Sequence, residues 1–320
     1  MSTQRTSQRV ADLAWAGRHE QAIAKATAAL KRKRFDAGER MALLDLRAES
    51  RVALGDLKGA GDDAKAMNAL AKQEGNAALQ ARAWCRESAI LVRAGKAARG
   101  AQTAAAAMTA AKQSGDPALI AQALWRLAAA QAGARIDLSG ASRRALRAAT
   151  LFERLGDVVL QGRALQTLSS IQWASLDTAA ASKAAAQALA LAQRSGDLFG
   201  QGAALNAIAL AHADIAQGLR IYRQALDAYK AAGYVLSATS VVANIGASNG
   251  DLGLYRRARR DERRREAASR HALAAARRGQ AAGALVAAQS GVAGQRIAYG
   301  GVQGARAIVA FAADEHDDPR

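Results

Sequence analysis

A two-residue mark, glycine followed by Asp or Asn, recurs along the chain at nearly constant spacing and constrains the fold more than any other feature. The pairs are Gly75-Asn76, Gly115-Asp116, Gly156-Asp157 and Gly196-Asp197, with glycines 40, 41 and 40 residues apart. Gly38 and Gly233 each lie 37 residues outside this series. Self-similarity at a period of roughly 20–50 residues is typical of repeat proteins. The sequence therefore predicts an array of similar units.

The residues at each mark favour the end of one helix and the start of the next. Glycine accepts the left-handed conformation that closes a helix, and Asp or Asn caps the following N-terminus. A weaker break divides each unit in two, as at Ala16-Gly17-Arg18, Leu54-Gly55-Asp56, Ala94-Gly95-Lys96, Ala132-Gly133-Ala134 and Ser175-Leu176-Asp177. We therefore expect helix pairs at about 6–16/19–34, 38–54/57–73, 77–93/97–113, 117–132/139–154, 158–174/178–194 and 198–213/215–231, and a seventh pair from about 235.

Composition supports this interpretation. The chain has 88 alanines among 320 residues, 2 prolines and 4% aromatic residues. Alanine has the highest helix propensity, whereas the β-branched and aromatic residues that fill sheets are scarce, so an all-β fold is excluded. Alanine also buries little apolar surface per residue. Thin layers of paired helices are therefore expected in place of one thick core.

Three units carry a more specific pattern. The seventh has Val242-x2-Ile245-Gly246-x2-Asn249 followed by Gly253-Leu254-Tyr255-x2-Ala258, the first has Gly17 to Ala22 and then Ala29-Leu30, and the sixth has Tyr222-x2-Ala225-Leu226. This order resembles the tetratricopeptide repeat (TPR) family, except that Asn249 stands where a tyrosine is usual. The period near 40 resembles the longer variant of MalT-like regulators and of regions beside bacterial adenylate/guanylate cyclase domains. The resemblance implies an all-α, right-handed α-solenoid of about seven antiparallel helix pairs over residues 5–258.

The pattern fails in the second helix of the seventh unit. Glu262 and Arg265 stand where the repeat needs apolar and small residues, ten arginines fall within 256–278, and no lysine follows Lys230. A glycine-rich stretch and an acidic end complete the tail, 259–320. Three interpretations stay open: a basic helix that binds nucleic acid, membrane or an acidic partner; a solvated linker; or a non-native sequence from a reading-frame slip. We expect this tail to be poorly ordered and to swing away from the array.

No residue pattern indicates catalysis. The histidines His19, His212, His271 and His316 lack partners at metal-ligand spacing, so no metal or cofactor is expected. His19 and His212 are expected to be solvated or to cap helices, and Cys85 to be a buried thiol. We expect the tryptophans to pack between the helix layers; they are Trp15, Trp84, Trp125 and Trp173. We expect a protein that is not an enzyme.

The net charge of +18 is spread along the chain, without the basic stripe and interleaved aromatic residues of a nucleic-acid platform. Nucleic acid is therefore disfavoured as a partner. No window reaches the roughly 20 apolar residues of a membrane span. The single cysteine and the absence of a signal-peptide run favour a cytoplasmic location in a bacterium.

Stacked helix pairs create a concave face, which in TPR-like arrays is lined by the first helix of each pair. Polar residues expected there are Asp45, Glu49, Arg82 and Arg93. They could hold an extended peptide or a helix of a partner protein, or be plain solvated charges. The predicted function is protein binding as a scaffold or sensor module. The alternative is the regulatory arm of a signalling protein, a nucleotide cyclase or transcriptional activator, whose effector domain is absent from this chain.

Overall fold

The repeated glycines lie at helix ends, as predicted. A computed structural model describes residues 4–32, 35–254 and 257–267. The glycines at 75, 115, 156 and 196 have positive φ angles between 58° and 72°. Beyond them, Asn76, Asp116 and Asp157 accept hydrogen bonds from backbone N–H groups of the next helix. One helix therefore ends and another begins within a few residues.

Within the described residues the chain forms thirteen labelled helices and a further helical segment at 257–267, with no strand. The helices are α1 Gln4–Trp15, α2 His19–Leu30, α3 Ala37–Leu54, α4 Leu57–Glu74, α5 Ala77–Arg93, α6 Ala97–Ser114, α7 Pro117–Ala134, α8 Leu138–Arg154, α9 Val158–Ala174, α10 Thr178–Ser195, α11 Leu198–Ala211, α12 Ile215–Ala231 and α13 Val235–Asp251. The predicted all-α array of about seven helix pairs is confirmed. None of these helices is long and apolar enough to cross a membrane.

Two glycines differ from their predicted role. Gly38 lies in the first turn of α3 with no positive φ, and Asp36 caps that helix by accepting from the Glu39 N–H at 2.8 Å. Gly133 lies inside α7, and the break moves to Arg135 at φ 54°. A Cβ on Gly133 would lie 3.1 Å from the Cβ of Ala97, so this glycine permits close approach of α6.

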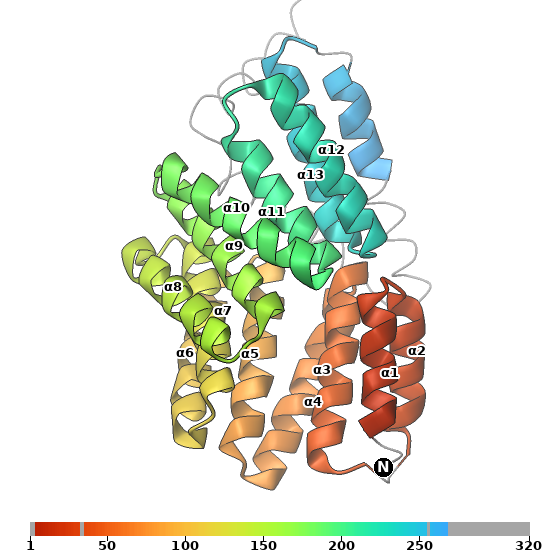
Figure 1. Ribbon diagram of the computed structural model, residues 1–320. Coiled ribbons are helices and arrows are strands. Elements are labelled where there is room, and N and C mark those ends of the chain that lie inside the picture. The colour runs from red at the N-terminus through yellow and green to blue at the C-terminus, as the bar shows by residue number, and fades with distance from the viewer. Residues whose placement is uncertain (1–3, 33–34, 255–256, 268–320) are drawn as a thin grey trace, which may run out of the picture.

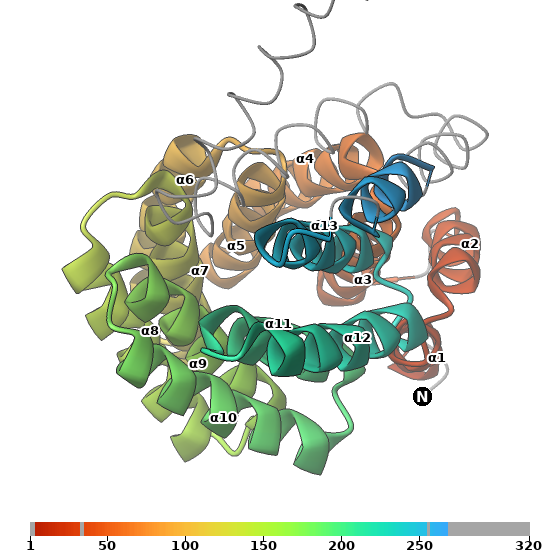
Figure 2. The ribbon, with the colours of Figure 1, turned by 90° about the horizontal axis from the view of Figure 1, so that it is seen from above.

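The pairs stack into two layers that run around a ring, with α3, α5, α7 and α9 on the inside and α4, α6, α8 and α10 on the outside (Figures 1 and 2). Small side chains let the layers approach closely, as in the cluster of Ala121, Ala145 and Ala164 around Phe152. Three of the tryptophans are at least partly buried, but Trp15 is 49% exposed, contrary to the prediction of interlayer packing.

The last units meet the first, and we call this contact the closure seam (Figure 2). The α1–α2 and α12–α13 turns touch there through Gly17 and Gly233, because a Cβ on Gly233 would lie 2.5 Å from the Gly17 carbonyl oxygen. The His19 Nε2 lies 2.9 Å from the Ala232 carbonyl oxygen, and α13 also packs on α3. His19 is only 2% exposed, so it is not solvated, but its contact with the Ala232 carbonyl at the end of α12 agrees with the predicted capping role. Ring closure buries it.

The helical segment 257–267 continues past the boundary predicted at residue 258. Its Asp261 accepts a hydrogen bond from Asn249 Nδ2 on α13 at 2.7 Å, and Arg265 pairs with Glu262. The asparagine that departs from the TPR pattern thus binds a polar residue of the next helix. Residues 268–320, most of the predicted tail, lie outside the described residues.

Candidate functional site

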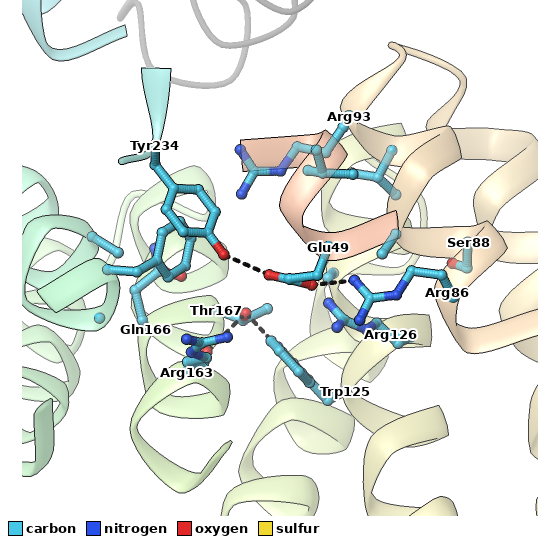
Figure 3. A pocket seen from close by; sticks show the side chains of 17 residues that line it. Glu49, Arg86, Ser88, Arg93, Trp125, Arg126, Arg163, Gln166, Thr167 and Tyr234 are labelled. Carbon is cyan, nitrogen blue, oxygen red and sulfur yellow. Dashed lines mark hydrogen bonds and ion pairs between the residues drawn. The ribbon is translucent and has the colours of Figure 1, made fainter. Parts of the chain in front are cut away.

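A pocket of about 160 Å³ lies on the inside of the ring, and we call it the ring pocket (Figure 3). It is lined by side chains from α3, α5, α7, α9 and α11, and by Tyr234, which immediately precedes α13. On α5 the lining residues Arg86, Ala89 and Arg93 follow the spacing i, i+3, i+7 that marks one face of a helix. The first helix of each unit therefore supplies the inner surface.

Glu49 on α3 connects this pocket to the closure seam. Its carboxylate accepts hydrogen bonds from Arg86 and from the Tyr234 hydroxyl, the latter at 2.6 Å, while Arg86 also binds Asp45 (Figure 3). Burial raises the pKa of Glu49, but the positive charges of Arg86 and Arg163 and the Tyr234 hydrogen bond outweigh it and hold the pKa well below its ordinary value. Glu49 is therefore ionised at neutral pH.

A second buried ion pair joins α9 to the start of α11. Arg163 Nε donates to Asp197 Oδ2 at 2.9 Å and its second nitrogen donates to Oδ1 at 3.1 Å, and Asp197 is 3% exposed. Asp197 was expected to cap α11, but its side chain makes no capping hydrogen bond. The carboxylate accepts the two hydrogen bonds from Arg163 instead. The same guanidinium lies 5.0 Å from the centroid of the Phe199 ring.

Two further arginines of the ring pocket, Arg93 and Arg126, form no ion pair within the described part of the chain. The Arg126 guanidinium lies 3.9 Å from the Trp125 ring centroid, and its buried Nε has no hydrogen-bond partner. Burial, reinforced by the charge of Arg86, lowers the pKa of Arg126 to about 10. Arg126 nevertheless stays cationic at neutral pH. Arg93 lies 5.9 Å from the Phe199 ring centroid.

The four residues predicted for the concave face fall into different places. Asp45 and Glu49 converge on Arg86, and Glu49 and Arg93 line the ring pocket. Arg82 lies one turn before Arg86 on the same face of α5, is exposed, and does not line the pocket. The prediction that these residues bind a partner stays a prediction.

Sequence reasoning missed the pocket arginines at positions 86, 126 and 163 and the tyrosine at 234. Arg82, Arg86 and Arg93 follow the spacing i, i+4, i+11, so helical periodicity alone could have placed Arg86 on the same face. Tyr234 reaches Glu49 across 185 residues of sequence, so nothing local places it in the site.

The site offers no metal centre and no activated thiol. Residues 4–32, 35–254 and 257–267 contain no group of three or more His, Cys, Asp or Glu side chains that could hold a metal ion. Cys85 is buried, as predicted, and burial raises its pKa to about 12. The thiol therefore stays protonated at neutral pH and is a poor nucleophile.

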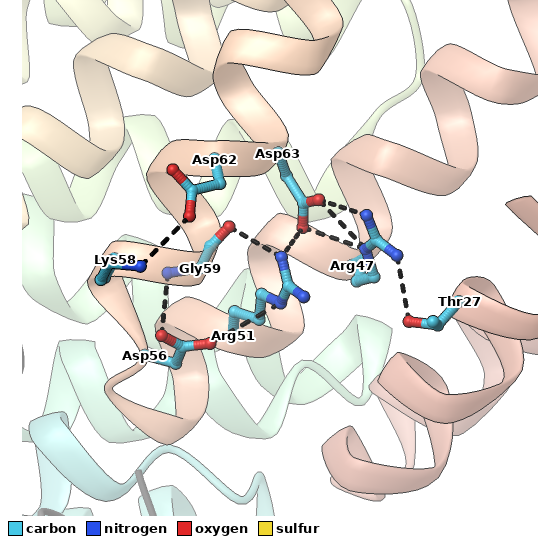
Figure 4. Close-up of polar contacts among 8 residues, drawn as sticks. All are labelled: Thr27, Arg47, Arg51, Asp56, Lys58, Gly59, Asp62 and Asp63. Carbon is cyan, nitrogen blue, oxygen red and sulfur yellow. Dashed lines mark hydrogen bonds and ion pairs between the residues drawn. The ribbon is translucent and has the colours of Figure 1, made fainter. Parts of the chain in front are cut away.

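A separate polar cluster joins the first two units (Figure 4). Asp63 on α4 is 1% exposed and accepts from Arg47 and Arg51 of α3, at 2.5 and 2.8 Å. Arg47 also donates to the Thr27 hydroxyl of α2, and Arg51 donates to the Gly59 carbonyl. Because every charge has a partner within the cluster, we assign it a structural role.

No family model and no curated protein matches the chain. Solved structures do match. A Rap protein complexed with Competence and Sporulation Factor has a TM-score of 0.63 and 12% identity, over 84% of this chain and 77% of that one. The fold is a TPR-like helical repeat. The apo form of RapI has a TM-score of 0.60 and 14% identity, over 84% of this chain and 98% of that one. Aspartyl phosphate phosphatase F from Bacillus subtilis has a TM-score of 0.57 and 12% identity, over 78% of this chain and 63% of that one.

Proposed function

We propose that this chain is a non-enzymatic binding module, a sensor or scaffold that holds a segment of a partner protein on the inside of its ring. The observation that carries the proposal is the concentration of charged side chains on the inner helices, around an open pocket. An inner layer that served packing alone would be apolar. The neighbour solved in complex with Competence and Sporulation Factor supports a binding role for this fold.

The partner-binding residues in this proposal are Asp45, Glu49, Arg82 and Arg93. Arg82 and Arg93 lie on one face of α5, eleven residues apart, which is about 16 Å along a helix. An extended segment of about five residues spans that distance. Exposed Arg82 would meet the partner at the mouth, and Arg93 would meet it inside the ring pocket.

The experiment compares two double charge reversals of equal size. Arg82→Glu with Arg93→Glu changes the inner face, whereas Arg99→Glu with Arg147→Glu changes exposed residues of the outer helices α6 and α8. Each purified variant is immobilised, and the proteins it retains from a cell extract are quantified by mass spectrometry. We expect a partner bound by the unmodified chain to be lost only with the inner variant, at unchanged helicity by circular dichroism.

Equal loss with both double variants would indicate general electrostatic attraction and would contradict the proposal. Repeating the capture at raised ionic strength separates the cases further, because attraction between exposed charges weakens as salt screens them.

The period near 40 residues supports the regulatory-arm alternative, in which this array belongs to a nucleotide cyclase or a transcriptional activator. A cyclase or DNA-binding domain encoded beside this array, in the same or an adjacent gene, would support it. A cytoplasmic location is part of both versions, and the free Cys85 thiol is compatible with a reducing compartment.

A further inference from the structure

The charges around the ring pocket do not balance. Three carboxylates face four guanidinium groups, which leaves one positive charge in excess. The carboxylates belong to Asp45, Glu49 and Asp197, and the guanidinium groups to Arg86, Arg93, Arg126 and Arg163. Because all three carboxylates are bound to Arg86 or Arg163, the excess falls on Arg93 and Arg126. A half-buried guanidinium group without a carboxylate partner is unfavourable, so the pocket favours an added anion.

The geometry of Arg126 indicates where an anion would bind. Its guanidinium carbon lies 3.9 Å from the Trp125 ring centroid, and its Nε is buried without an acceptor. Guanidinium groups bind carboxylates through two parallel hydrogen bonds. Arg93 lines the same pocket and supplies a second cation there.

The size and remaining walls of the pocket narrow the anion to one class. A volume of about 160 Å³ is close to that of engineered cavities of roughly 150 Å³ that hold benzene. Trp125, Phe199, Ala129 and Ala203 add apolar surface to its walls, and the two aromatic rings lie beside the arginines. A phosphate group near neutral pH carries close to two negative charges, more than the single excess charge here. One carboxylate on a small apolar body matches both the charge and the walls.

We propose that the ring pocket binds a carboxylate group attached to a small apolar body, with Arg126 and Arg93 as its ligands. The carboxylate has two possible sources. One is a free small carboxylic acid, which makes the pocket a metabolite-binding site. The other is the C-terminal carboxylate of a protein segment held inside the ring, and this source rests on the proposed function.

The first experiment measures thermal unfolding of the full chain with benzoate as the probe. A benzoate concentration of about ten times the Kd raises the Tm by about 2–3 °C for a protein of this size. Arg126→Met removes the charge at similar length, so this variant should lose the shift. Its Tm without probe should equal or exceed that of the unmodified chain, because an unpaired buried cation is gone.

Two further variants keep this test decisive. Arg147→Met, an exposed arginine on α8, is the matched control and should keep the full shift. Arg93→Met should reduce the benzoate-induced shift in Tm. If Arg126→Met does not fold, Arg93→Met serves as the test in its place. A benzoate shift that persists in Arg126→Met would show that Arg126 does not bind the probe and would overturn the proposal. An equal shift from inorganic phosphate would overturn the assignment to carboxylates.

The second experiment separates the sources with the tetrapeptide alanyl-alanyl-alanyl-phenylalanine, as free acid and as C-terminal amide. A bound chain terminus predicts that the acid binds about tenfold more tightly than the amide, and that Arg126→Met abolishes this difference. Benzoate binding without peptide binding assigns the site to a free acid. If no probe binds, the carboxylate site is refuted, while the capture experiment on the inner face still decides the proposed function separately.

Discussion

Gly196 and Gly233 look alike in sequence and differ in their surroundings. Each follows the second helix of a pair, α10 or α12, and their φ angles are 70° and 71°. A Cβ on Gly196 would meet nothing within 4 Å, whereas one on Gly233 would meet the Gly17 carbonyl oxygen at 2.5 Å. The first glycine only turns the chain between neighbouring units. The second also brings the two ends of the array together.

The two regions therefore draw on interactions of different range. Repeat units stabilise one another mainly through their nearest neighbours, which Gly196 and its equivalents bring into register. The closure seam joins residues far apart, His19 with Ala232 across 213 residues and Glu49 with Tyr234 across 185. The seam can thus be broken while the local helices stay intact.

The largest effect is expected from Gly233→Val. The side chain would collide with the Gly17 backbone and would also occupy a left-handed conformation, which together cost about 3 kcal/mol or more. Urea unfolding followed by circular dichroism measures the loss. Native helicity should persist, because the seam and not the helices is disturbed. A loss no larger than that of Gly196→Val would show that the two ends do not touch.

Tyr234→Phe removes one hydroxyl from the seam and leaves the ring in place. Because Glu49 is ionised, the lost hydrogen bond is to a charged group, and we expect a decrease of about 2 kcal/mol in the free energy of unfolding. An unchanged midpoint and slope in urea would mean that this bond contributes nothing to closure.

Gly196→Val measures the purely local contribution. Valine has free space there but resists the left-handed backbone, so the expected loss is about 1–2 kcal/mol. A melting curve identical to that of the unmodified chain would refute the capping role of Gly196.

The chain end provides a comparison outside the seam. A chain that stops at residue 267 keeps the Asn249–Asp261 hydrogen bond, and one that stops at Ala258 loses it. We expect the shorter chain to lose about 1 kcal/mol, a few degrees in Tm, and to retain its helicity. A collapse of the array on truncation at 267 would instead show that residues 268–320 form part of the fold.

Light proteolysis provides an independent check, since we predict that residues beyond 267 are removed first.

The smallest effect is a pH dependence of the seam. Burial lowers the pKa of His19, more than the Ala232 carbonyl and the charge of Glu49 raise it. The folded state therefore favours the neutral imidazole. Its contribution to stability is complete above the unfolded pKa of about 6.5 and decreases as the pH falls below that value. We expect a lower Tm at pH 5.5 than at pH 7.5, and a smaller difference in His19→Gln.

Sequence reasoning succeeded where the cause is local. Helix ends at Gly115-Asp116 follow from the conformations these two residues favour, whatever surrounds them. It failed at Gly133, because a glycine that lets two helices approach resembles one that turns the chain. It failed again at Asp197, whose carboxylate could cap α11 or bind an arginine of the preceding unit.

The site was predictable only in part, for the same reason. Glu49 and Arg93 belong to the first helices of their units, and helical periodicity places them on the inner face. Their partners depend on the curvature of the whole array. A small rotation per unit, summed over six units, decides whether Tyr234 reaches Glu49, and no local pattern in the sequence encodes that sum.

The closure seam also limits how the protein can evolve. An open solenoid can gain or lose a repeat by duplication or deletion, since each unit contacts only its neighbours. Here such an event would carry Gly233 away from Gly17 and remove one wall of the ring pocket. The number of repeats is therefore fixed by geometry. Length variation among descendants of this sequence should be confined to outer turns such as that at Leu176, which is 86% exposed.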